Sequence, residues 1–182
     1  MSQKMLGIDL FRVDTVPQHE LGLQVIDVRG GEGQFSFKEV IDGATTFRRF
    51  DPAGEYRYVK AGTGGVLEGV GVTIETGAGD ITVPNQVINM TAEGIIEGVP
   101  MVTALVNQFL WIQINGKHYN LNVLDAVADD VLLEPGAGPS LIAATLDIAH
   151  YAAATGGVSI RKIHDASTIG GAVNRGVGTI RP

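Results

Sequence analysis

The sequence contains no cysteine, so disulfide bonds, cysteine-ligated zinc and a thiol nucleophile are all excluded. Charged residues are scarce as well, at 18% of the chain against about 25% in an average soluble protein. Acidic residues outnumber basic ones by 20 to 13, which gives a formal charge of −7 and a pI near 5.0. Nucleic acid and anionic membranes require a basic face, so we expect neither as the main partner.

The sequence also lacks a long apolar run. No uninterrupted stretch approaches the ~20 residues of a membrane helix, and the first 13 residues lack the apolar core and cleavage site of a secretory signal. We therefore expect the chain to be made and assembled in a cytoplasm. Its 182 residues suffice for one domain with a sizeable core, although two small domains remain an alternative.

Glycine, by contrast, is abundant, with 25 residues where a usual fraction of ~7% would give about half as many. Short alternating apolar segments are separated by turn signals about every ten residues, which is typical of a sandwich or barrel. We therefore predict an all-β fold, an antiparallel β-sandwich or barrel of short strands. Residues 1–20 have no sustained periodicity and are predicted to be an extended N-terminal arm, followed by a single β domain over residues 21–182.

Strands are expected in most of the apolar segments of this domain. The clearest lie at residues 34–40, 55–60, 66–76, 158–163 and 177–180. Shorter or less regular ones are expected at 21–28, 81–83, 87–90, 95–96, 101–106 and 123–133.

The strongest local signal is Asn115-Gly116, which lies between two runs rich in aromatic and β-branched residues. Asn-Gly is favoured in the two-residue type I′ turn of a β-hairpin, so we predict a hairpin over residues 109–123 with Ile114 opposite Lys117. That register divides the side chains between an apolar face and a wet face. The apolar face would hold Leu110, Ile112, Ile114, Tyr119 and Leu121, and the wet face Trp111, Gln113, His118, Asn120 and Asn122.

One short helix competes with strand and loop at residues 140–154, SLIAATLDIAHYAAA. Ser140 is a suitable N-cap, alanines are abundant, and Ile142 and Leu146 begin a helical spacing. The alternative divides the segment into a strand and a loop, and the sequence leaves both open.

Two glycine-rich stretches, residues 62–65 and 136–140, could be mistaken for phosphate-binding loops. The first leads into a strand, and the second lacks the Lys-Ser/Thr pair of a P-loop. Neither therefore predicts nucleotide binding, and we expect no cofactor.

The histidines and carboxylates give no recognisable site. His19, His118, His150 and His164 have no metal-binding spacing. A hydrolytic triad of His164, Asp165 and Ser167 is disfavoured, because adjacent strand residues point to opposite faces. A glycosidase pair or a calcium site could be sought among five carboxylates: Glu93, Glu97, Asp125, Asp129 and Asp130. A glycosidase pair needs a specific separation across a cleft, which the sequence does not show. Asp125, Asp129 and Asp130 lack calcium-loop spacing and are expected to form a solvated acidic turn. We assign no catalytic, cofactor-binding or metal residue and expect no enzyme.

Residues 51–62, DPAGEYRYVKAG, resemble a strand of the tailed-bacteriophage capsid decoration proteins, also called cement proteins. In that pattern Y-R-Y-V-K-A-G follows a turn and precedes a glycine-rich turn and a further strand, which matches residues 66–69 here. A later F-x-W-V-Q-x-x-G strand of the family is similar to residues 109–116, FLWIQING. Residues 17–22 are similar to the entry of the family's first strand, and residues 156–160 to its late G-x-x-I strand.

The resemblance implies a non-enzymatic structural virion protein. Such a protein binds the outside of an assembled phage capsid at junctions between coat subunits and stabilises their contacts. The implied partners are the major capsid protein and further copies of the chain, most simply in a trimer. The segment 43–50 is longer than the family pattern, which is a departure from it.

Two other functions compete with this interpretation. A carbohydrate-binding β module of a phage tail or surface protein would use exposed Trp111 or Tyr119 as a stacking platform. A hydrolase on a β scaffold would need clustered acids with shifted pKa values. With 6% aromatic residues and one tryptophan, the sugar-binding interpretation has little support. The surroundings of Trp111 distinguish sugar binding from the role of a structural virion protein.

Overall fold

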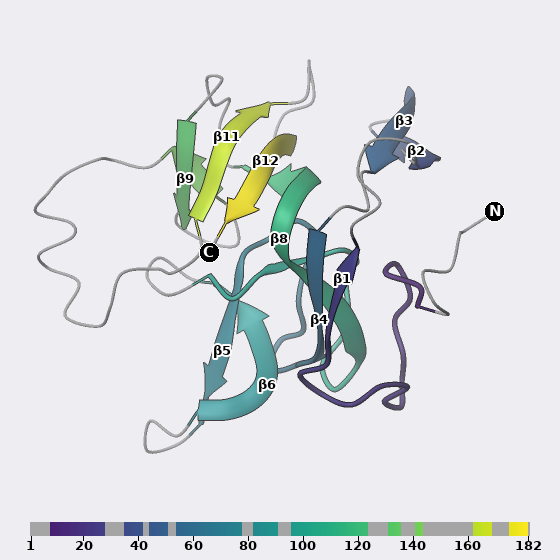
Figure 1. The fold of residues 1–182 in the computed structure, drawn as a ribbon, viewed down its shortest axis with the longest axis vertical. Coiled ribbons are helices and arrows are strands. Elements are labelled where there is room, and N and C mark those ends of the chain that lie inside the picture. Colours follow the sequence, from purple (N-terminus) through teal and green to yellow (C-terminus); the bar gives the residue numbers. More distant parts are fainter. Residues whose placement is uncertain are drawn as a thin grey trace, which may run out of the picture.

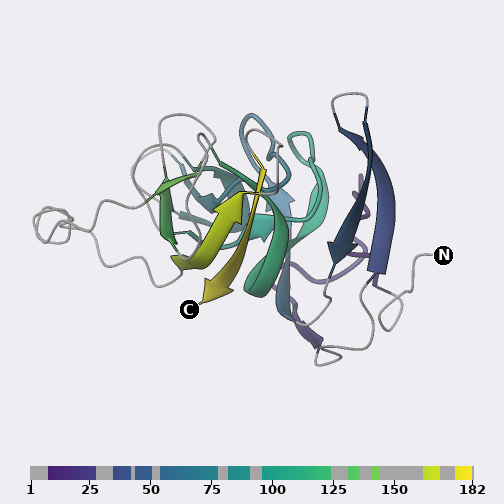
Figure 2. The same ribbon diagram turned by 90° about the horizontal axis from the view of Figure 1, so that it is seen from above.

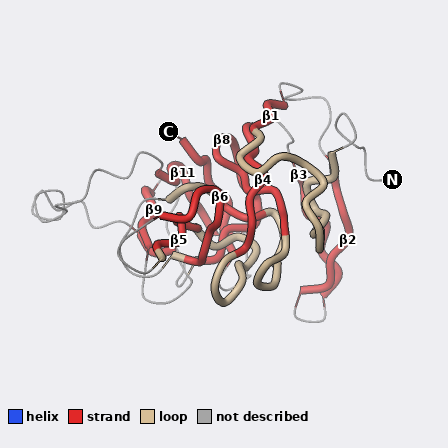
Figure 3. The backbone as a smooth tube through the Cα atoms, turned by 90° about the horizontal axis from the view of Figure 1, so that it is seen from below, coloured by secondary structure: helices blue, strands red, loops and turns tan. Residues whose placement is uncertain are grey.

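The computed structural model describes residues 8–27, 35–41, 44–50, 54–77, 82–90, 96–123, 131–135, 141–143, 162–168 and 175–181. These residues contain β-strands and no helix, which confirms the predicted all-β fold (Figure 3). No helix that is long and apolar enough to cross a membrane occurs within the described ranges.

The described residues form twelve strands. They are β1 (Gln24–Asp27), β2 (Phe35–Ile41), β3 (Ala44–Phe50), β4 (Gly54–Ala61), β5 (Val72–Thr76), β6 (Thr82–Asn89), β7 (Val99–Pro100), β8 (Phe109–Asn122), β9 (Val131–Pro135), β10 (Leu141–Ala143), β11 (Lys162–Thr168) and β12 (Arg175–Arg181).

Ten of these strands form one open sheet in the order β10-β9-β11-β12-β8-β4-β6-β5, with β1 beside β4 and β7 beside β8 (Figure 1). Every ladder is antiparallel except the one between β4 and β6, where Lys60 is opposite Gln86. The expectation of a purely antiparallel architecture is therefore wrong at this pair. After β4 the chain passes to β5 at the edge of the sheet and then turns back into β6. Strand β6 lies between β5 and β4 and therefore runs parallel to β4.

The predicted hairpin at Asn115-Gly116 is also wrong, because β8 continues through both residues as one strand of 14 residues. Gly116 has a positive φ of 106°, whereas Asn115 is not among the residues with positive φ. Residues before the glycine pair with β4, and residues after it pair with β12. Partners from distant parts of the chain thus replace the local turn, and the glycine marks a bend where the strand changes neighbours.

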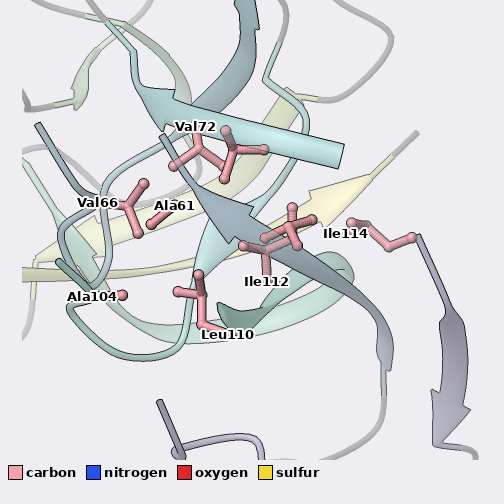
Figure 4. Packing of buried hydrophobic residues seen from close by; sticks show 9 residues of the cluster. Ala61, Val66, Val72, Ala104, Leu110, Ile112 and Ile114 are labelled. Atoms are coloured by element: carbon pink, nitrogen blue, oxygen red, sulfur yellow. The ribbon is translucent and has the colours of Figure 1, made fainter. Parts of the chain in front are cut away.

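Three hydrophobic clusters form the core. One covers a face of β4 and β8 and contains Leu110, Ile112 and Ile114, which lie close to Val66 and Val72 (Figure 4). The second, which we call the aromatic cluster, lies on the opposite face and consists of Ile8, Leu10, Tyr56, Tyr58, Met101, Phe109 and Trp111. The third joins β8, β9 and β12 through residues such as Leu121, Leu133 and Ile180.

Four of the five residues of the expected wet face are buried, and the fifth, Asn122, is partly exposed. Trp111, Gln113, His118 and Asn120 are all at most 5% exposed. The apolar side was predicted correctly for Leu110, Ile112, Ile114 and Leu121, which are also buried. A central strand covered on both faces shows no simple alternation of apolar and polar residues, which is why the pattern misled the prediction.

The segment at which a helix competed begins as a strand. Leu141–Ala143 is β10 and pairs with β9, so the helix interpretation is wrong for these residues. Residues 144–154 lie outside the described ranges.

Strands β2 and β3 form a separate two-stranded sheet, which we call the ribbon. Their ladder runs from Phe35 opposite Phe50 to Ile41 opposite Ala44. Two perpendicular views show the ribbon beside the main sheet (Figures 1 and 2). The segment 43–50, which exceeds the decoration-protein pattern, thus contains one ribbon strand.

Candidate functional site

The aromatic cluster is the best-defined group of chemically active side chains, and a segment from the predicted arm covers it. We call residues 8–20 the strap. Ile8 and Leu10 are 8% and 5% exposed and pack into the cluster. Asp14 forms a bridge with Phe109, with N–O distances of 2.9 and 2.8 Å in the two directions. The strap therefore packs against the sheet of its own chain.

Asp14 also places a buried carboxylate against this cluster. The Tyr58 hydroxyl donates a hydrogen bond of 2.9 Å to Oδ2 of Asp14, and Arg12 Nε lies 2.6 Å from Oδ1. The Tyr58 oxygen in turn accepts a hydrogen bond of 3.2 Å from the backbone N–H of Gln18. These contacts fasten the strap to β4 at two points.

Burial disfavours the charged phenolate and raises the pKa of Tyr58 to about 12. The hydrogen bond from Gln18 opposes this rise, whereas the hydrogen bond to Asp14 and its negative charge add to it. The phenol therefore remains a neutral hydrogen-bond donor at all physiological pH values.

Cross-strand pairing sets the position of the aromatic rings. Tyr58 is directly opposite Trp111 in the β4–β8 ladder, and their ring centroids are 5.1 Å apart. His19 of the strap contacts both rings, with centroid distances of 5.1 Å to Tyr58 and 5.3 Å to Trp111. Because Tyr58 and Trp111 are 0% and 2% exposed, neither ring can serve as an open stacking platform.

The glycine-rich turn at residues 62–65 uses its donors within the chain. The Glu75 carboxylate accepts hydrogen bonds from the backbone N–H of Thr63, at 3.2 and 3.3 Å, and from the Gln86 side chain. The bonds from Gln86 and then Thr63 lower the pKa of Glu75. The protein's own carboxylate thus accepts the Thr63 N–H, a donor that a bound phosphate would need. The other stretch, residues 136–140, lies outside the described ranges.

The remaining sequence candidates do not come together in the described part of the chain. Glu97 forms an ion pair of 2.6 Å with Arg57, and no group of three metal-ligating side chains occurs among the described residues. His164 lies opposite Thr179 and Ser167 opposite Val177 in the β11–β12 ladder, which places backbone only. The other candidates lie outside the described ranges: Glu93, Asp125, Asp129, Asp130 and His150.

A second polar group, which the sequence did not reveal, lies at the end of β8. His118 is 2% exposed and its Nδ1 accepts a hydrogen bond of 3.1 Å from the Asn120 N–H. The Asn120 side chain donates to the Glu68 carboxylate. The loop around Gly69 crosses β8 here, and the Asn122 N–H donates to the Gly69 carbonyl at 2.9 Å. Only the fold brings residues 68 and 120 together, so no short motif could have identified them.

Seven exposed large apolar side chains occur on the described surface, in two groups. The first group lies on the strap, with Phe11 and Val16, and at β1, where Leu23 directly precedes the strand and Ile26 lies in it. Leu67, Leu105 and Val106 belong to two loops that are joined by the Val66–Ala104 bridge. Exposed apolar groups of this kind are candidates for contacts with other macromolecules.

No family model matches the chain, and the searches of curated proteins and of solved structures also give no match.

Proposed function

We propose that this chain is a structural virion protein that binds the outside of an assembled tailed-phage capsid and stabilises the contacts between coat subunits. Its partners would be the major capsid protein and two further copies of itself. It would have no enzymatic activity and no cofactor, and its place would be the capsid surface after assembly in the host cytoplasm.

The burial of Trp111 is the observation that carries the choice between this proposal and the carbohydrate-binding alternative. A sugar-stacking platform has to be open to solvent, and this side chain is 2% exposed beneath the strap. The described aromatic residues therefore favour a structural role over sugar binding. Tyr119 gives no argument in either direction, because its side chain lies outside the described set.

The placement of the family-like motifs gives further support. Residues 54–61 and 109–116, which carry most of the resemblance, are neighbouring strands in one ladder. Tyr56 and Tyr58 lie with Phe109 and Trp111 in the aromatic cluster. A pattern shared with decoration proteins would thus specify one continuous unit of the core, which is what a fold signature requires.

Co-sedimentation tests the proposal directly. Purified chain is mixed with expanded heads assembled from the coat protein of the phage that encodes it, and bound chain is quantified after pelleting. We expect saturable binding and a higher melting temperature of the decorated heads. The carbohydrate-binding function would be supported instead if the chain did not bind heads but bound glycans on an array, and if the same glycans in solution quenched Trp111 fluorescence.

A further inference from the structure

The ribbon differs in composition from the rest of the chain. Residues 35–50 contain four of the six phenylalanines. They also contain three basic and two acidic residues, which gives a formal charge of +1 and leaves −8 on the remainder. The ribbon is therefore an aromatic, weakly basic element attached to an acidic body.

A ribbon of this kind needs a surface to cover it. Strands β2 and β3 pair with each other and with no other described strand, and two views place them beside the main sheet (Figures 1 and 2). An isolated two-stranded sheet is only marginally stable in water, because it buries too little apolar area. Strand β3 also comes close to β8, and a surface of a second copy that packs on the ribbon would add further burial.

The chain offers a surface with complementary properties. We call the exposed side of residues 8–27 the strap face. It carries four of the seven exposed large apolar side chains, with Val16 at 60% and Ile26 at 66% exposure. Asp14 is buried, and the other charged side chains of these residues are one basic and three acidic, a formal charge of −2. Apolar and electrostatic complementarity therefore coincide on two elements of one molecule.

We propose that the ribbon of one copy docks on the strap face of the next copy. Apolar contacts would hold the two surfaces together, and the opposite charges would orient them. Ribbon and strap face are different surfaces, so the contact is head-to-tail and can close into a ring. This inference deepens the proposed function and takes from it only the expectation that the ring contains three copies.

Charge reversal tests this contact in solution, without capsids. Arg48→Glu with Arg49→Glu changes the formal charge of residues 35–50 from +1 to −3. Glu20→Lys with Gln24→Lys changes the formal charge of the strap face from −2 to +1 at two exposed positions. We expect sedimentation velocity to show self-association weakened at least about tenfold in either double variant, as like charges then face each other. The chain with all four substitutions should recover the wild-type assembly.

The recovery distinguishes a direct contact from damage to either element. Unchanged circular dichroism and melting of each double variant provide the folding control. The contact is overturned if wild-type protein is monomeric at high micromolar concentration, or if both double variants associate like wild type. It is also overturned if the fourfold variant remains dissociated although it is folded. Head binding by a protein that fails this test would leave the capsid function intact, since the sedimentation-velocity assay contains no capsids.

Discussion

A buried carboxylate is stable only when its oxygens have partners, and at the residue scale Asp14 shows how the strap meets this requirement. Tyr58→Phe removes the hydroxyl that donates to Oδ2 while it keeps the ring. We expect a loss of about 1–3 kcal/mol in the free energy of unfolding at pH 7, because the carboxylate oxygen stays buried without that donor. Urea denaturation of both proteins measures this difference.

The same pair of proteins gives a pH test. The pKa of Tyr58 rises from 10.0 to about 12 on folding, so its stabilising effect is complete below pH 10 and is lost as the pH approaches 12. Wild-type stability should therefore fall across this window, and the fall should be smaller in Tyr58→Phe. Equal slopes in the two proteins would show that the phenol does not carry this pH dependence.

Gly69 and Gly64 form a matched pair of glycines with φ of +76° and +81°. A Cβ at Gly69 would lie 1.9 Å from the Asn120 carbonyl oxygen, whereas a Cβ at Gly64 would meet nothing within 4 Å. Gly64→Ala should cost about 1–2 kcal/mol for the backbone conformation alone. Gly69→Ala should cost about 3 kcal/mol or more, since the loop must also move away from β8. Similar melting temperatures of the two variants would contradict the close crossing at Gly69.

At the scale of elements, the sequence predicts strands better than their partners. Alternation located β2 and β4 to within a residue or two, because their period is local. It failed at residues 109–123, where the Asn-Gly turn signal is also local but pairing with β4 and β12 is not. It also divided β6 at Pro84, which this strand accommodates next to Asn85 at a positive φ of 58°.

Substitution at the bend of β8 distinguishes one long strand from a hairpin. A type I′ turn requires positive φ at both central residues, so a hairpin would be damaged equally by Asn115→Val and Gly116→Val. Of these two residues, only Gly116 has positive φ in the structure. We therefore expect Gly116→Val to lower the free energy of unfolding by about 1–3 kcal/mol. Asn115→Val should have a clearly smaller effect, and chemical denaturation ranks the two.

The strap shows how an element without periodicity can belong to the core. Leu10→Ala removes a side chain that is 5% exposed and packs in the same cluster as Trp111. We expect a loss of about 2–5 kcal/mol and a red shift in the emission of Trp111, the one tryptophan of the chain. Phe11→Ala, at a neighbouring side chain that is 38% exposed, is the control. It should change neither the free energy of unfolding nor the emission of Trp111 by much. A silent Leu10→Ala would mean that the strap leaves the sheet in solution.

At the scale of the whole molecule, the sequence identified a class of fold but not the long-range side-chain hydrogen bonds that hold it together. Asp14 and Tyr58 are 44 residues apart, and Glu68 and Asn120 are 52 apart. Neither pair lies in a motif, so only the folded arrangement shows that these side chains meet.

Assembly gives the last prediction, which concerns the strength of capsid binding. If three weak contacts act together, each held copy raises the effective concentration of the others, and the ring binds far more tightly than one chain. Arg48→Glu with Arg49→Glu should then dissociate from heads at least about tenfold faster than wild type, because it binds as single copies. Fusion of this variant to a trimeric coiled coil restores the valence without restoring the ribbon. Slow dissociation of the fusion would assign the loss to assembly, whereas continued fast dissociation would mean that the ribbon itself contacts the coat protein.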